Sequence, residues 1–115
     1  MHVMEVSRED WPAFLNEFSR RWKGLAATVD RQPPEMIAER IVERSPLQAV
    51  SMIEGGSAME IVAGDGVDRW AHRVDGPVRV LFAETTRGGS AAIQIECAGN
   101  QAMLIQVRNE NEVWQ

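Results

Sequence analysis

The sequence predicts a single α+β domain over residues 1–115, in which one N-terminal helix packs on six to eight short, mostly antiparallel strands. The start of the chain carries an apolar stripe at helical spacing, and after Gly24 the apolar period changes to two. Several later segments are apolar on both faces, as at Leu81 between Val80 and Phe82. A sheet open to water on one side rarely has that pattern. We therefore expect a strongly curled or barrel-like sheet, or one covered by the helix.

The helix is expected from about Arg8 to Lys23. Its apolar residues follow one another at spacings of three and four and form one face: Trp11, Phe14, Leu15, Phe18 and Trp22. Acidic residues lie towards its start and basic residues at its end, which complements the helix dipole. Each buried aromatic side chain removes roughly 150–250 Å² from water. The stripe is therefore expected to fix the helix onto the sheet, with Trp22 as the member least firmly assigned to the core.

The strands are expected between residues 25 and 108, followed by a short C-terminal tail. The clearest pair is a hairpin of residues 91–98 and 102–109 around a Gly-Asn-Gln turn. Residues 47–53 read as a separate strand. Residues 36–44 are ambiguous, because the spacing of four between Ile37 and Ile41 favours a helix while their alternation with glutamates favours a strand equally well.

The opening Ser7-Arg8-x-x-Trp11-Pro12-Ala13-Phe14, followed by Phe18-Ser19-Arg20-Arg21, resembles that of an uncharacterised family of small bacterial soluble proteins. The segment "SPLQAVSM" and the His72 strand followed by "GPVRV" resemble the middle of that family, in the same order. The resemblance implies a bacterial domain with an extended strand at residues 36–44, and it implies no activity. Trp22 stands where relatives more often carry a polar residue or histidine, which removes an imidazole from this helix end.

The composition is that of an ordinary globular domain, with 44% hydrophobic and 25% charged residues in a chain of 115. No apolar run reaches the length of a membrane span, and the first residues lack the pattern of an export signal. Cys97 is the only cysteine, which excludes an internal disulfide and is typical of a reducing compartment. We therefore expect a soluble cytoplasmic protein. The net charge of −5 shows no basic cluster, so nucleic-acid binding is not favoured.

The sequence predicts no catalytic residue, no cofactor site and no metal site. His2, His72 and Cys97 lack the spacing of metal ligands, and Cys97 fits an inward apolar set. The segment "GDGVDR" lacks the third glycine of a dinucleotide-binding loop, and "RGGS" lacks the lysine of a phosphate-binding loop. Both segments are predicted to be turns between strands.

Two groups of residues are candidate sites. Arg20, Arg21, Trp22 and Lys23 form a candidate contact surface, because adjacent cationic groups beside an indole can bind acidic partners. A simpler interpretation is that basic residues favour a helix C-terminus on electrostatic grounds alone. Trp70, His72 and Arg73 are the candidate wall of a pocket between helix and sheet, although a half-exposed strand histidine without a role is the simpler interpretation there.

The expected function is that of a non-catalytic domain acting by protein contact or self-association, because short strands leave sheet edges available for pairing. The alternative is a small-molecule pocket near His72, catalytic or not. A weaker alternative is nucleic-acid contact through Arg20, Arg21 and Lys23. No membrane partner is expected.

Overall fold

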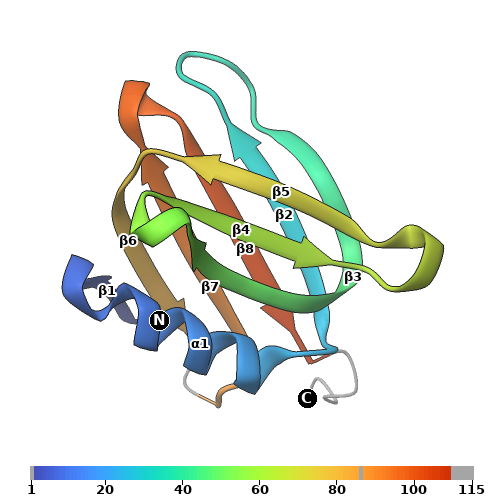
Figure 1. The fold of residues 1–115 in the computed structure, drawn as a ribbon. Coiled ribbons are helices and arrows are strands. Elements are labelled where there is room, and N and C mark those ends of the chain that lie inside the picture. The colour runs from blue at the N-terminus through green and yellow to red at the C-terminus, as the bar shows by residue number, and fades with distance from the viewer. Residues whose placement is uncertain (1, 86, 110–115) are drawn as a thin grey trace.

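The computed structural model describes residues 2–85 and 87–109 and has one helix and eight strands (Figure 1). A short strand precedes the helix, and seven strands follow it. The elements are β1 (His2–Val6), α1 (Trp11–Trp22), β2 (Ala26–Gln32), β3 (Glu39–Ile53), β4 (Ala58–Ala63), β5 (Trp70–Asp75), β6 (Pro77–Glu84), β7 (Ser90–Cys97) and β8 (Ala102–Arg108). The predicted α+β class, with one N-terminal helix on an antiparallel sheet, is confirmed. The expected C-terminal tail lies outside the described residues.

The sheet has the strand order β1-β6-β7-β8-β2-β3-β4-β5, and every neighbouring pair is antiparallel. It stays open, with β1 and β5 as its two edges, so the expected barrel-like or strongly curled sheet is not supported. Apolar residues on both faces have another cause. Phe82 packs under α1, at 5.2 Å from Phe14 between ring centroids, while Leu81 is only half-buried on the opposite face. The helix covers part of one face, so closure is not needed to bury these residues.

The predicted apolar stripe of α1 forms part of the core. Trp11, Leu15, Phe18 and Trp22 are each at most 4% exposed, and the ring of Phe18 packs edge-to-face on Phe82 at 6.2 Å. The indole N–H of Trp11 donates to the carbonyl oxygen of Val6 at 2.9 Å, which ties the end of β1 to the helix. Trp22 therefore belongs to the core and does not protrude. No helix of the described residues is long and apolar enough to cross a membrane.

The long strand β3 changes partner half-way, and α1 completes its edge. Residues 39–46 pair with β2, and residues 47–53 pair with β4. Beside the second half, the Ser19 hydroxyl of α1 donates to the carbonyl oxygen of Val50 at 2.9 Å and accepts from its N–H at 2.8 Å. The N–H of Leu47 donates to the carbonyl oxygen of Leu25 at 2.9 Å. The helix and the residues after it thus occupy the place of a missing strand.

Two segments differ from their predictions. Residues 2–6 form β1, which the sequence analysis did not predict. The ambiguous segment is extended from Glu39 onward, as the resemblance implied, and it runs without a break into residues 47–53. Pro46 lies at the point where β3 changes partner, and its carbonyl oxygen accepts from the N–H of Gly64 at 2.7 Å. A proline is tolerated there because it lacks only the N–H donor.

Candidate functional site

In the predicted contact surface at the end of α1, two basic residues already have acidic partners. Arg20 pairs with Glu17 at 2.5 Å, and this hydrogen bond holds the pKa of Glu17 below its usual value. Arg21 pairs with Glu84 at 2.6 Å and lies 5.2 Å from the ring centre of Trp22, which is itself buried. Lys23 is exposed. Two of the three cationic groups are thus held by carboxylates, and the indole does not reach the surface.

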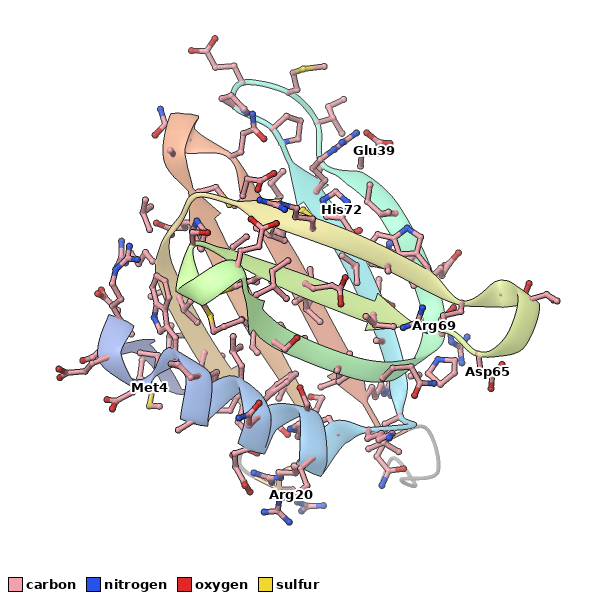
Figure 2. All side chains as sticks on the ribbon, in the orientation of Figure 1. Met4, Arg20, Glu39, Asp65, Arg69 and His72 are labelled. Atoms are coloured by element: carbon pink, nitrogen blue, oxygen red, sulfur yellow. The ribbon has the colours of Figure 1, made fainter. Side chains whose placement is uncertain are left out.

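The predicted pocket residues lie on β5, on the side of the molecule opposite Arg20 (Figure 2). The rings of Trp70 and His72 stack at 5.6 Å with 10° between their planes. A cavity of about 370 Å³ borders His72 and Arg73, and Arg31 and Cys97 line its other side. Its walls come from β5 and the ends of β2, β7 and β8. No residue of α1 lines this cavity, so the cavity beside His72 lies among strands and not between helix and sheet.

Arg73 is held in place by two carboxylates. It bonds to Glu54 with both terminal nitrogens, and its Nε donates to Asp75 at 2.6 Å. These hydrogen bonds raise the pKa of Arg73 above its usual value, the bond to Glu54 most of all. The guanidinium of Arg73 therefore ties β5 to the turn between β3 and β4.

The Cys97 thiol is half-buried, and its Sγ lies 3.9 Å from the carbonyl oxygen of Ile95. Burial raises the pKa of Cys97, and the charge of Asp75 raises it further. The thiol stays protonated at neutral pH, which is the opposite of an activated cysteine nucleophile. In residues 2–85 and 87–109, no three His, Cys, Asp or Glu side chains are grouped so that they could hold a metal ion.

The segment "GDGVDR" forms a tight connection between β4 and β5, as predicted. Gly64 has a φ of +81°, and a Cβ there would lie 2.3 Å from the carbonyl oxygen of Asp68. Only glycine fits this position, and the reason is the close approach of two backbone segments.

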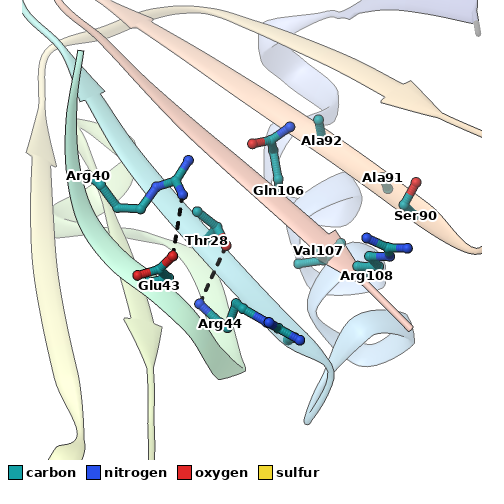
Figure 3. A pocket seen from close by; sticks show the side chains of 11 residues that line it. Thr28, Arg40, Glu43, Arg44, Ser90, Ala91, Ala92, Gln106, Val107 and Arg108 are labelled. Carbon is teal, nitrogen blue, oxygen red and sulfur yellow. Dashed lines mark hydrogen bonds and ion pairs between the residues drawn. The ribbon is translucent and has the colours of Figure 1, made fainter. Parts of the chain in front are cut away.

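Two features of the structure were not expected from the sequence. The first is a groove of about 560 Å³ on the face of the sheet away from α1, where β2, β3, β7 and β8 carry its walls (Figure 3). We call it the outer-face groove. The groove is lined by the carboxylate of Glu43 and by three arginines, which are Arg40, Arg44 and Arg108. The alternation of Met103, Ile105 and Val107 in the sequence could have indicated that Arg108 faces outward. Arg40 and Arg44 could not be placed, because residues 36–44 were ambiguous between helix and strand.

The second missed feature is the free edge of β1. Val3 is 59% exposed and Met4 46% exposed, although both belong to a strand of the sheet.

Comparisons of the chain with protein-family models, with curated proteins and with solved structures found no match.

Proposed function

We propose that the protein is a non-catalytic domain that acts by protein contact, and that it self-associates through the free edge of β1. β1 pairs with β6 on one side, and no described strand pairs with its other side. An edge strand presents unpaired N–H and C=O groups, which are a template for a further strand. This geometry favours the protein-contact function over the other functions that the sequence predicts.

The side chains of β1 suit such pairing on both faces of the sheet. Met4 lies opposite Phe82, whose ring contacts Phe14, so Met4 extends the apolar side of the sheet that begins under α1. Val3 exposes an apolar side chain on the opposite face. The one acidic group, Glu5, is turned back towards β6, where its Oε1 accepts from Arg79 at 3.0 Å.

The other edge of the sheet is protected. β5 exposes Arg73 and Asp75, and Arg73 also binds Glu54. Charged side chains on an edge strand discourage pairing because a second strand would have to desolvate them. The contrast between an apolar edge at β1 and a charged edge at β5 is the observation that carries the proposal.

A second copy of the chain is the occupant that we propose. Two β1 strands pairing antiparallel about a two-fold axis would give an isologous interface and a continuous sheet. Five residues per strand bury less than the roughly 1,600 Å² of a standard interface, so we expect weak and reversible association.

Cys97, a half-buried free thiol, suits the reducing bacterial cytoplasm that the sequence predicts.

Sedimentation equilibrium from about 10 to about 500 μM tests the proposal, with weak association expected in the upper part of this range. The wild-type mass should rise with concentration, and Val3→Lys should remain a monomer. Val67→Lys is the matched control, because Val67 is fully exposed but lies in the turn between β4 and β5. A wild-type monomer throughout the range would overturn the proposal, as would equal effects of the two substitutions.

A small-molecule site beside His72 is the second candidate, and the cavity of about 370 Å³ favours it. Ring proton spectra of His72 recorded during a fragment screen would test it, since His72 borders the cavity and a bound fragment should shift its ring. A screen in which no fragment shifts this ring would exclude it. Nucleic-acid contact through Arg20, Arg21 and Lys23 stays the weakest prediction, because Arg20 and Arg21 are each paired with a glutamate. If the protein is not retained on a polyanion column, this prediction is excluded.

A further inference from the structure

A second pocket lies on the outer face of the sheet, at the other end of β2 and β8 from the outer-face groove. Its volume is about 550 Å³, which is within the range of small-molecule sites. Its floor is one row of paired residues, in which Gln32 of β2 lies opposite Ala102 of β8, and Ala102 lies opposite Glu96 of β7. Since neighbouring strands are about 4.8 Å apart, Gln32 and Glu96 stand roughly 10 Å apart with only a methyl group between them. The small central residue leaves the hollow.

The rim of this pocket comes from the loop after β2 and the turn before β8, which lie at the same end of the molecule (Figure 1). Pro33 and Pro34 belong to this loop, and a proline ring fixes the backbone φ. We call the site the proline-rimmed pocket. Val78 of β6 lines it as well and is 53% exposed. The pocket therefore combines a stiff rim with an apolar surface that water covers when no ligand is present.

Four polar side chains of the pocket are free to bind a ligand. Within residues 2–85 and 87–109 they have no hydrogen-bond or ion-pair partner, and they are Gln32, Glu35, Asn100 and Gln101. A side-chain amide has two donor and two acceptor sites, whereas a carboxylate has acceptor sites only. The free groups together therefore offer more acceptors than donors, and a matching ligand has an excess of donors.

The charge of the pocket is negative. None of its described lining residues is basic, and two of them are glutamates. Glu96 already has partners, since it accepts from the amide of Gln94 at 3.3 Å and lies 3.7 Å from Arg79. Glu35 is exposed and has none, so the uncompensated charge is that of Glu35. An anionic ligand would be repelled here, and a cation with N–H donors would be attracted.

We infer that the proline-rimmed pocket binds a small aliphatic amine that is protonated at neutral pH. An ammonium group has three donors and no acceptor, which complements the free groups of the pocket. The ammonium donates to the carboxylate of Glu35 and to the amide oxygens of Gln32 and Gln101. The carbon chain of the amine packs on Pro34 and Val78. The inference does not rest on the pairing of β1, because no residue of β1 lines the pocket.

An amide NMR titration with putrescine tests the inference. Two reference probes separate charge from shape: butane-1,4-diol has the same chain length without charge, and tetramethylammonium has the charge without N–H donors. Putrescine should give saturable shifts at Gln32, Gln94 and Gln101, with an affinity at least about threefold above that of either reference. The ring of His72 should not shift, since His72 borders only the neighbouring cavity, which shares Gln101 with this pocket.

Glu35→Gln and Gln101→Ala should each weaken putrescine binding about threefold, as expected for an exposed ion pair and for a neutral hydrogen bond. Both residues are exposed, so both variants should keep the wild-type spectrum outside the pocket. Glu9→Gln is the matched control for charge, since Glu9 is exposed beside α1. Gln106→Ala is the matched control for the amide, since Gln106 is on β8 but lines the outer-face groove.

Three results would each overturn the inference. The first is a titration in which putrescine gives no saturable shift at about 20 mM, because even millimolar affinity would then be absent. The second is a response centred on His72, or equal binding of putrescine and a reference probe. The third is a control variant that weakens binding as much as its partner in the pocket does.

Discussion

Replacing Ser19 with alanine tests how α1 completes the edge of β3. The Ser19 hydroxyl both donates to and accepts from the backbone of Val50, at 2.9 and 2.8 Å. Val50 is fully buried, so its two backbone groups lose their partners and gain little contact with water. Each lost hydrogen bond costs on the order of 1 kcal/mol, and more where the remaining group stays dry. We expect Ser19→Ala to lower the free energy of unfolding by about 2 kcal/mol, out of roughly 5–15 kcal/mol for a domain of this kind.

Urea denaturation measures this loss. The substitution should leave the m-value unchanged, because the variant and the wild type expose the same surface on unfolding. Hydrogen exchange gives a local readout, since the Val50 amide should exchange faster in the variant. Ser57→Ala is the matched control: its hydroxyl also donates to a carbonyl, that of Glu54 at 3.0 Å, but on the surface. We expect it to cost less than about 0.5 kcal/mol. If Ser19→Ala costs no more than Ser57→Ala and Val50 keeps its protection, the helix does not act as a strand partner.

Three further predictions concern the core, a turn and the thiol. Trp11→Phe removes the donor to the Val6 carbonyl and should cost about 1–3 kcal/mol in urea denaturation; a loss below about 0.5 kcal/mol would contradict the role of this bond. Gly64→Ala should lower the melting temperature more than Gly55→Ala, because both have positive φ but only Gly64 would bring a Cβ against backbone. Equal shifts would refute this. Since burial raises the pKa of Cys97, its alkylation by iodoacetamide should be slow at pH 7 and still accelerate above about pH 8.5; a plateau below that pH would show an activated thiol.

The helix could be predicted from the sequence because its signals are local. The spacing of Trp11, Phe14 and Phe18 and the glycine after the last turn lie within one short segment, and the structure buries the predicted stripe except for Phe14, which is half-buried. β1 could not be predicted in this way. Its five residues have no local partner, and Met4 pairs with Phe82, which is far along the chain. A strand of that length is recognised only by the pairing that it makes.

The outer-face groove was missed for a related reason. Sequence periodicity assumes regular strands, and two bulges between β2 and β3 break the alternation between Arg40, Val42 and Arg44. The candidate residues Arg20 and Arg21 were chosen from their adjacency in the sequence, which cannot show that Glu84 pairs with one of them across the fold.

The position of β2 in the sheet has a consequence for biosynthesis. β2 hydrogen-bonds with β8, so Val29 finds Ile105 only after the segment that contains β8 has been synthesised. Pairings of such long range slow folding, because the intervening chain must be ordered first. Until then β1, β6 and β7 can assemble separately from β2 to β5, and the edge of β2 that later pairs with β8 stays open. An unpaired strand edge of this kind makes an incomplete chain prone to aggregate until β8 joins the two parts.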